Sequence, residues 1–178
     1  SELKEISKKV LNNLNFPLFI KPSNSGSSLG ISKINNIKEF PLALKKAQEI
    51  DKRIIIEEGL NVRELECGII GKNNLYSSVI GEVDYKSEWY DYESKYKLEN
   101  KLIIPALIDE NIREQIQNFA IEACKALNID VFARVDFFLE KGTNNIYLNE
   151  INTIPGFTDK SMFPLLWKAS GLDIDQLV

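Results

Sequence analysis

Residues 131–152 read VFARVDFFLEKGTNNIYLNEIN, and this stretch contains two apolar runs on either side of a polar turn. Gly, Thr and Asn at 142–145 favour a tight turn, so the stretch predicts an antiparallel β-hairpin. Because side chains alternate between the two faces of a strand, Arg134 and Asp136 share one face, away from the apolar residues beside them. Charged side chains in such a strand are costly unless they are paired or bind an ion.

The return strand of this hairpin ends in further oxygen donors. Strict alternation sorts it into two faces, with Tyr147, Asn149 and Ile151 on one and Leu148, Glu150 and Asn152 on the other. Pairing of the two strands would bring Asp136 beside Glu150 and Asn152. Carboxylate and amide oxygens suit a magnesium ion that keeps part of its coordination shell for phosphate oxygens. The hairpin therefore predicts a site for a metal ion and an anion, with polar residues facing water at a strand edge as the alternative.

A second candidate for phosphate binding lies near the start of the chain. The apolar run 18–22 predicts a strand that carries Lys21 near its end, and the loop that follows, 23–30, reads SNSGSSLG. Such a loop can surround phosphates with backbone N–H groups and hydroxyls while the lysine supplies charge. The order differs from the P-loop pattern, in which the lysine follows the glycines, so an ordinary hairpin turn is the alternative.

Two further segments could complete a nucleotide site. A buried strand predicted at 53–60 ends in acidic residues, and Glu57, Leu60 and Glu64 could offer an apolar slot for a purine and a carboxylate for ribose hydroxyls. Acids that are merely solvated at a strand end are the alternative. The aromatic and charged stretch 89–96, WYDYESKY, is unusual on a surface unless it covers something, so it predicts a lid.

Hydrophobic periodicity accounts for the remaining elements. It predicts a hairpin over 63–85 and helices over 3–14, 36–50, 110–128 and 163–170. Asn36 with Glu39 favours a capping-box start for the second of these helices. The inner stripe of the 110–128 helix is expected to comprise Ile112, Ile116, Phe119, Ala120, Ala123 and Leu127.

Composition excludes several classes of function. The 178 residues, enough for one globular domain or two small lobes, carry a net charge of -4, which gives no nucleic-acid footprint. Histidine is absent, which excludes imidazole from proton transfer and metal ligation. Cys67 and Cys124 lie in apolar segments without metal spacing, so buried reduced thiols are expected. No run is long enough to cross a membrane and no signal peptide is present, so a cytoplasmic location is expected.

Several short motifs occur together along the chain. They are FIKP at 19–22, GSSLG at 26–30, YDYESKY at 90–96, RVD at 134–136, NEINTIPGFT at 149–158 and SMFP at 161–164. In combination they resemble the signature of D-alanine–D-alanine ligases, members of the ATP-grasp superfamily, from about Phe16 to the end. The resemblance implies an α+β ATP-grasp fold in which two lobes with antiparallel sheets sandwich the nucleotide. Residues 1–60 would belong to the central lobe and 61–178 to the C-terminal catalytic lobe.

The same resemblance implies roles for individual residues. The ATP site would comprise Lys21 at the α- and β-phosphates, Ser27 and Ser28 in the flap over the triphosphate, Glu57, Leu60 and Glu64 around adenine and ribose, Lys95 in the lid and Phe138 under adenine. Two magnesium ions, or Mn²⁺ in their place, would be held by Asp136, Glu150 and Asn152, with Glu150 bridging. The catalytic set would add Arg134 and the Gly156 N–H at the oxyanion, Tyr96 closing over the substrates, and Ser161 with Met162 at the carboxylate of the second D-alanine.

The implied reaction is the ADP-forming ligation of two D-alanines through an acyl phosphate, a step in peptidoglycan precursor synthesis and hence in cell wall biogenesis and cell shape. Relatives that join D-alanine to D-serine or D-lactate are alternatives. Lys95-Tyr96 and Ser161-Met162 look like the D-alanine type, since D-lactate relatives place a histidine in the lid. Another ATP-grasp carboxylate–amine ligase, a nucleotide-binding module without catalysis and an α+β interaction domain are further alternatives.

The resemblance also departs from the family pattern. The family's N-terminal domain, with the glutamate that binds the first amino group, and a second phosphate-binding lysine have no counterpart in these residues. Because the chain also begins without methionine, a catalytic fragment that is inactive by itself is expected. The full-length protein is expected to be a homodimer that acts on D-alanine, with no nucleic-acid or membrane partner.

Overall fold

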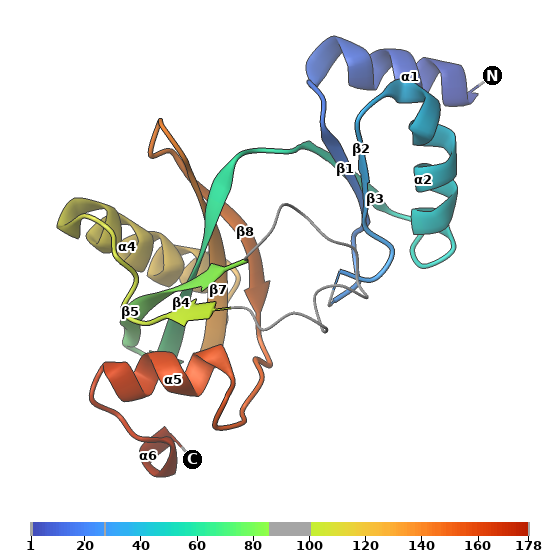
Figure 1. Cartoon of the computed structure of the whole chain (residues 1–178). Coiled ribbons are helices and arrows are strands. Elements are labelled where there is room, and N and C mark those ends of the chain that lie inside the picture. Colours follow the sequence, from blue (N-terminus) through green and yellow to red (C-terminus); the bar gives the residue numbers. More distant parts are fainter. Residues whose placement is uncertain (1, 27, 86–100, 178) are drawn as a thin grey trace. The chain divides into compact units, whose positions relative to one another are not determined.

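The structure is a computed structural model that describes residues 2–26, 28–85 and 101–177. The described part of the chain divides into two compact units, one within residues 2–60 and the other comprising residues 61–85 and 101–177 (Figure 1). Each unit combines helices with an antiparallel sheet, which confirms the predicted α+β class. The assignment of these units to the central and C-terminal lobes stays a prediction.

The first unit is a three-stranded sheet with helices packed on one face. Its elements are α1 (Glu2–Asn13), β1 (Leu18–Pro22), β2 (Ser32–Ile34), the 3₁₀ helix η1 (Ile37–Glu39), α2 (Phe40–Gln48) and β3 (Ile54–Glu58), with strand order β2-β1-β3. Leu18 and Ile20 of β1 are buried in one cluster with residues of α1 and α2. The alternate residues of the same strand, Phe19 and Lys21, therefore lie on the opposite face.

The predicted residues Asn36 and Glu39 cap the start of the second helix, but without the reciprocal bonds of a capping box. The Asn36 side chain accepts a hydrogen bond from the Lys38 N–H at 3.1 Å, and the Glu39 carboxylate accepts one from the Asn35 N–H at 3.0 Å. These bonds satisfy donors that a helix start leaves without intrahelical partners. The first turn is 3₁₀, so the α-helix itself begins only at Phe40.

The second unit is a five-stranded antiparallel sheet with a helix on each face (Figure 1). Its strands are β4 (Val62–Gly71), β5 (Leu75–Asp84), β6 (Lys101–Ile103), β7 (Val131–Glu140) and β8 (Ile146–Asn152), in the order β6-β5-β4-β7-β8. The helices are α4 (Glu110–Ala126), α5 (Met162–Ala169) and α6 (Ile174–Leu177). Both predicted hairpins, β4–β5 and β7–β8, are confirmed.

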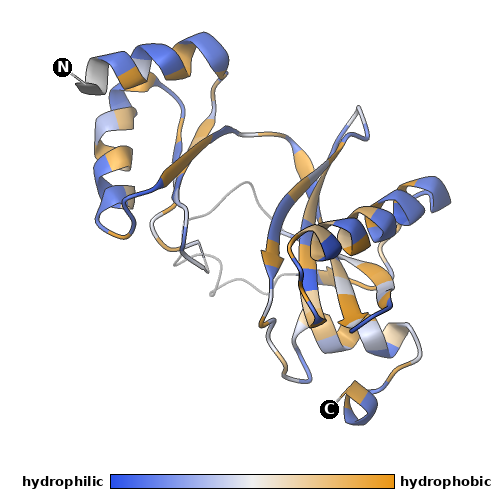
Figure 2. Cartoon of the chain, turned by 180° about the vertical axis from the view of Figure 1, so that it is seen from behind, coloured by the Kyte–Doolittle hydropathy of each residue, from blue (hydrophilic) through white to orange (hydrophobic). Residues whose placement is uncertain are grey.

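The α4 face of this sheet is the apolar core. Ile116, Ala120 and Cys124 of α4 are buried against alternate residues of β4, β5 and β7, and Figure 2 shows hydrophobic and hydrophilic residues alternating around the helix. Phe119 and Leu127 do not belong to this stripe, because 42% and 62% of their surfaces are exposed. The expected buried stripe of α4 was therefore too wide. Residues spaced four apart, such as Ile116, Ala120 and Cys124, lie on the helix side that contacts the sheet, whereas Phe119 and Leu127 lie outside this contact.

Both cysteines are confirmed as buried free thiols. Cys67 lies in β4 and Cys124 in α4, and both belong to the core on the α4 face. Burial raises the pKa of Cys67 to about 12, so its thiol stays protonated at neutral pH. Neither residue is therefore a candidate nucleophile or metal ligand.

Two glycines allow α5 to pack closely against the other face. A Cβ atom at Gly81 of β5 would lie 2.8 Å from both Leu166 Cδ2 and Met162 Sδ, and one at Gly68 of β4 would lie 2.7 Å from Trp167 Nε1. Side chains at these positions would push the helix away from the sheet. The rest of β4 on this face carries Glu64 and Glu66.

The β7–β8 hairpin differs from the prediction in one respect. Asp136 pairs with Glu150, but Phe137 pairs with Leu148, so Asn149 is an extra residue and forms a β-bulge. Beyond the bulge the alternation is reversed, and Tyr147 lies opposite Phe138 on the face of Glu150 and Asn152. The prediction that Leu148 shares this face and Tyr147 the other was therefore wrong, because one inserted residue inverts every side chain after it.

Some expectations fall outside what the structure describes. The predicted lid at 89–96, with Lys95 and Tyr96, and the flap residue Ser27 lie outside the described residues. Among the described residues, no helix has the length and apolar character needed to cross a lipid bilayer.

Candidate functional site

The polar face of the second unit contains a row of three acidic residues across three neighbouring strands. Strand register places Glu66 of β4 opposite Asp136 of β7, and Asp136 opposite Glu150 of β8. In the adjacent row, Arg134 lies opposite Asn152. The hairpin thus brings Asp136 beside Glu150 and Asn152, as the sequence predicted, while their role as metal ligands stays a prediction.

Arg134 is the cation at the centre of this cluster. Its Nε donates to Asp136 Oδ1 at 2.7 Å and its Nη2 to Oδ2 at 2.8 Å, which is a bidentate fork. The same Nε lies 2.8 Å from Glu66 Oε2. Asn152 Nδ2 also donates to Asp136 Oδ2 at 3.0 Å. Both oxygens of Asp136 are therefore engaged by neighbouring side chains.

The cluster holds more negative than positive charge. Burial, and then the charge of Asp136, raises the pKa of Glu66 to about 8. Burial also raises the pKa of Asp136, although the fork with Arg134 acts in the opposite direction. Burial acts to lower the pKa of Arg134, but its hydrogen bond with Asp136 and the nearby carboxylates hold that pKa above its usual value. A bound cation would offset the excess negative charge.

These residues fit a magnesium ion by the chemistry of their donors. Asp136, Glu150 and Asn152 present hard oxygens, and the uncompensated charge around them favours a divalent cation. Within the described ranges, no three Asp, Glu, Cys or His side chains form a group that could hold a metal. The remaining coordination positions would thus depend on Asn152 and on oxygens of a phosphate-bearing ligand, as Mg²⁺ sites on nucleotides commonly do.

The next row of the same face contains two predicted nucleotide contacts and one residue that the sequence did not indicate. Glu64 of β4 lies opposite Phe138 of β7. Burial, together with the charge of Glu64 and a hydrogen bond with it, raises the pKa of Tyr85. Tyr85 thus lies on the polar face beside Glu64. The sequence indicates this only through the position of Tyr85 directly after a strand with alternating polar and apolar residues.

Glu66 is the other residue that sequence reasoning missed. Its side chain is only 13% exposed, and it lies between the predicted ribose-binding Glu64 and the Arg134 fork. Glu64 and Glu66 alternate with the buried residues Leu65 and Cys67, so both acids lie on the opposite face of the strand. This alternation could have identified Glu66 as a residue of the polar face. Only the pairing of β4 with β7 shows that Glu66 faces Asp136.

The loop between β8 and α5 places Gly156 and Ser161 together. Ser161 Oγ accepts a hydrogen bond from the Thr158 N–H at 3.1 Å and lies 2.8 Å from Thr158 Oγ1. A Cβ atom at Gly156 would lie 2.9 Å from Ser161 Oγ, so glycine allows the loop to fold onto the start of α5. Phe157 packs with Phe132 and Phe163 at centroid distances of 6.1 and 5.6 Å, which anchors the loop.

Met162 contributes to this region mainly by packing. Its side chain is 6% exposed and its sulfur lies against Gly81. Ser161 is the N-cap of α5, with extended backbone and no side-chain capping bond. Any contact of Met162 with a ligand would therefore use its backbone N–H at the helix start, where such groups bind anions.

In the first unit, two of the predicted nucleotide contacts form an ion pair. Lys21 Nζ lies 2.5 Å from Glu57 Oε1, and both side chains project from the sheet face that α1 and α2 leave uncovered. Ser28 lies in the loop after β1 with a φ of 60°, and Leu60, just after β3, is 36% exposed. The open face thus presents the Lys21–Glu57 pair, whose ammonium could bind a phosphate and whose carboxylate could bind a ribose.

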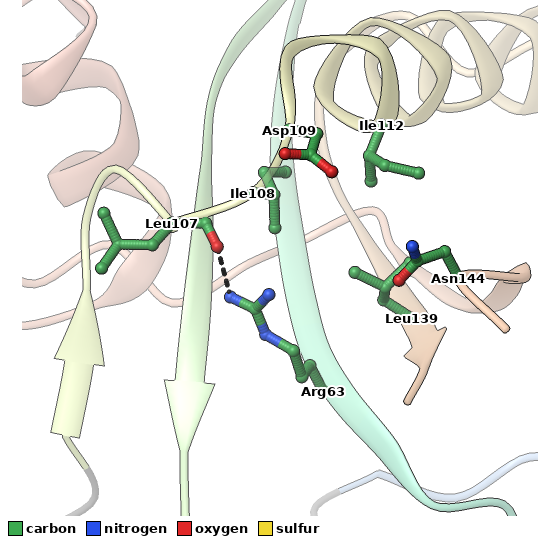
Figure 3. A pocket seen from close by; sticks show the side chains of 7 residues that line it. All are labelled: Arg63, Leu107, Ile108, Asp109, Ile112, Leu139 and Asn144. Carbon is green, nitrogen blue, oxygen red and sulfur yellow. Dashed lines mark hydrogen bonds between the residues drawn. The ribbon is translucent and has the colours of Figure 1, made fainter. Parts of the chain in front are cut away.

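A cavity of about 400 Å³ lies elsewhere, on the α4 face of the second unit (Figure 3). It is lined by Arg63, Leu107, Ile108, Asp109, Ile112, Leu139 and Asn144 and contains none of the predicted site residues. The Arg63 guanidinium is bound by Glu82 at 2.8 and 2.6 Å and donates to the Leu107 carbonyl at 2.9 Å. Arg63 therefore ties β4 and β5 to the segment before α4.

Comparison with known proteins identifies the family. All residues, 1–178, match the family model described as D-ala D-ala ligase C-terminus. The chain belongs to this family. The resemblance read from the motifs is thereby confirmed.

Relatives of the D-Ala-D-Ala ligase family are similar over nearly the whole chain. The D-alanine–D-alanine ligase of Prochlorococcus marinus (strain MIT 9515) is 68% identical over 173 residues, which cover 97% of this chain and 49% of the relative. That of Prochlorococcus marinus (strain NATL1A) is 49% identical over 177 residues, or 99% of this chain and 51% of the relative. The chain thus spans about half the length of the curated relatives it matches.

Solved structures agree on the fold. The VanG D-Ala:D-Ser ligase from Enterococcus faecalis has a TM-score of 0.88 at 38% identity, covering 98% of this chain and 51% of that structure. The D-alanine–D-alanine ligase from Coxiella burnetii has a TM-score of 0.84 at 32% identity, covering 98% and 46%. The predicted ATP-grasp fold of the D-Ala-D-Ala ligase family is confirmed.

Proposed function

We propose that this chain is the catalytic portion of an ATP-dependent D-alanine–D-alanine ligase that makes a peptidoglycan precursor in the cytoplasm. The observation that carries the proposal is the placement of Asp136 opposite Glu150, with Arg134 and Asn152 in the adjacent row. This arrangement combines oxygen donors for Mg²⁺ with a permanently charged guanidinium, as phosphoryl transfer followed by acyl transfer requires. The names of the relatives at up to 68% identity support the choice of D-alanine.

In this proposal the predicted nucleotide contacts have the roles that the family resemblance implies. Lys21 would contact the α- and β-phosphates once it leaves Glu57, and Glu57 and Glu64 would accept hydrogen bonds from ribose hydroxyls. Leu60 and Phe138 would contact adenine. Ser27, Ser28 and Lys95 would cover the triphosphate, although Ser27 and Lys95 lie outside the described residues.

Asp136, Glu150 and Asn152 would hold Mg²⁺, which neutralises charge on the phosphate oxygens when it is bound. A carboxylate oxygen of the first D-alanine would attack the γ-phosphorus of ATP, the bond from that phosphorus to the β,γ-bridging oxygen would break, and ADP would leave, which gives the acyl phosphate. Catalysis by the chain is positioning and electrostatics, and no side chain needs to form a covalent bond to substrate.

The second step would use the start of α5 and Arg134. The carboxylate of the second D-alanine would be bound by the Ser161 hydroxyl and by the Met162 N–H at the start of α5, so that its amine can attack the acyl carbon. Arg134 and the Gly156 N–H would stabilise the tetrahedral oxyanion, from which phosphate leaves. Tyr96 would close over the substrates, although it lies outside the described residues.

A D-alanine–D-serine ligase is the second candidate. It is supported by the VanG neighbour, whose structure is similar at a TM-score of 0.88 and 38% identity. Relatives named D-alanine–D-alanine ligase reach 68% identity, which favours D-alanine as the second substrate. Mn²⁺ in place of Mg²⁺ and a homodimer of the full-length protein belong to the same proposal.

The test is a substrate comparison with the full-length protein that carries this chain. ADP release is measured with ATP and Mg²⁺ in the presence of D-alanine alone, and with D-alanine plus D-serine or D-lactate, and the dipeptide product is identified by mass. Magnesium-dependent formation of D-alanyl-D-alanine is expected. Formation of only the D-serine product would replace the first candidate with the second, and no ADP release under any condition would overturn both.

A further inference from the structure

Glu66 is a buried acid at the edge of the proposed site with no role in the scheme above. It lies on β4 directly opposite Asp136, and its side chain is 13% exposed. A buried carboxyl group normally has its oxygens satisfied by hydrogen bonds. Glu66 Oε2 is buried and makes no hydrogen bond to any residue in the described part of the chain.

The unsatisfied oxygen lies beside a donor that is already in use. Arg134 Nε carries one hydrogen, and two acidic oxygens lie within reach of it, Asp136 Oδ1 at 2.7 Å and Glu66 Oε2 at 2.8 Å. The hydrogen bond goes to Asp136, which also binds Nη2. Glu66 is thus a second acceptor for the same N–H, held at hydrogen-bond distance.

Metal binding would change this competition. An Asp136 oxygen that ligates Mg²⁺ would lie about 2.1 Å from the ion. If Asp136 also kept its two hydrogen bonds with Arg134, the guanidinium would be held close to a divalent cation. Repulsion between the two cations favours opening of the fork. The guanidinium would then lose its anchor unless another acceptor takes its N–H, and Glu66 Oε2 is the acceptor in position.

We propose that Glu66 is a positioning residue that accepts the Nε–H of Arg134 when Asp136 turns to the metal ion. It thereby keeps the guanidinium in place for the oxyanion and lowers the cost of releasing Asp136. This inference rests on the proposed function, because it requires a metal ion at Asp136. A direct role for Glu66 as a third acidic ligand is disfavoured, since no such group of acids forms a metal site among the described residues.

Two variants of Glu66 separate these roles. Glu66→Leu removes the acceptor, whereas Glu66→Gln keeps an acceptor oxygen at the same reach and removes the charge. In the full-length protein, Mn²⁺ affinity in the presence of a non-hydrolysable ATP analogue is measured by electron paramagnetic resonance. Glu66→Leu is expected to weaken Mn²⁺ binding about 10-fold or more, as loss of an outer-shell partner does, while Glu66→Gln keeps most of the wild-type affinity.

Steady-state kinetics provide a second measurement, because a purely structural role of Glu66 would not lower kcat while leaving KM for ATP unchanged. Because Arg134 acts on the transition state, Glu66→Leu should lower kcat by about 10-fold or more with little change in KM for ATP, and Glu66→Gln should restore kcat. Circular dichroism verifies that both variants fold. Glu66→Ala, which adds no new contact, replaces the leucine variant if that protein is unfolded.

Three outcomes would overturn the inference. Wild-type Mn²⁺ affinity and kcat in a folded Glu66→Leu or Glu66→Ala protein would show that the acceptor is not used. An equal loss in Glu66→Gln would assign Glu66 to charge or direct metal ligation. Absence of Mn²⁺ binding by the wild-type protein with nucleotide would instead overturn the proposed metal site, and the inference with it.

Discussion

The two faces of the five-stranded sheet in the second unit are built from the same strands but differ in their chemistry. On the α4 face, Leu65 and Phe137 are almost fully buried in an apolar core. Their immediate neighbours in the same strands, Glu66 and Asp136, belong to a charged cluster on the other face. This is possible because successive side chains of a strand point to opposite sides. Substitutions on the first face should therefore change stability, and those on the second face ligand binding.

The largest effect is expected from neighbouring phenylalanines that lie on different faces. Phe137→Ala should lower the free energy of unfolding by about 3–5 kcal/mol, because it removes a fully buried ring and leaves a cavity. Phe138→Ala, on the polar face, should cost about 1 kcal/mol and weaken ATP binding instead. Urea unfolding and nucleotide titration measure the two quantities. Equal losses of stability would contradict the division between the faces.

A change in the acidic row should reduce activity without reducing stability. Glu150→Gln keeps the size of the side chain but removes a proposed metal-ligating charge, so magnesium-dependent activity should fall at least about 100-fold. The free energy of unfolding should stay within about 0.5 kcal/mol, because Glu150 is exposed in β8. Glu140→Gln, at the hairpin turn, is the matched control and should leave activity unchanged. A stability loss as large as that of Phe137→Ala would mean that Glu150 is structural.

A substitution where α5 packs on the sheet should change both stability and substrate binding. Gly81→Val would place side-chain atoms where Leu166 and Met162 already lie at 2.8 Å, so unfolding should become easier by about 1–3 kcal/mol. Because α5 begins at the proposed carboxylate site, KM for the second amino acid should also rise. Thermal unfolding and steady-state kinetics check the two effects. A normal KM in a destabilised protein would separate α5 packing from substrate binding.

The smallest effect concerns the pH dependence of the apolar face. Burial raises the pKa of Cys67 from 9.0 to about 12, so the unfolded state loses this proton at a lower pH than the folded state. The stability that the neutral thiol contributes is complete below pH 9 and is lost as pH rises toward 12. At pH 10 the loss should be about 1.4 kcal/mol. Cys67→Ala should show a correspondingly flatter dependence of unfolding free energy on pH between 8 and 10.5, and an unchanged slope would refute this assignment.

Local sequence patterns predicted much of the division of residues between the apolar and polar faces of the sheet. The alternation in VFARVDFFLE placed Arg134 and Asp136 away from Val135 and Phe137, and burial of the latter two confirms it. The turn at 142–145 predicted the β7–β8 hairpin and so the approach of Asp136 to Glu150. Such signals are reliable because they depend on the backbone geometry of a few adjacent residues.

Details of register were not predictable in the same way. The bulge at Asn149 inverts the faces of Leu148 and Tyr147, and nothing in the local composition distinguishes it from regular alternation. Phe119 and Leu127 were expected to be buried because they are apolar, yet the width of the contact between α4 and the sheet leaves them exposed. In both cases the outcome depends on how an element fits its neighbour.

The sequence by itself determined the α+β fold, the family and the residue types available for binding metal, phosphate and substrate. These follow from periodicity, turn chemistry and motifs in which every member is close in the chain. Only the tertiary structure decided that Glu66 faces Asp136, that Arg134 has two acidic acceptors within reach of Nε, and that Gly68 and Gly81 make room for α5. The physical reason is that pairing of β4 with β7, and packing of α5 on β4 and β5, join segments far apart in sequence, and those contacts depend on the energy of the whole fold.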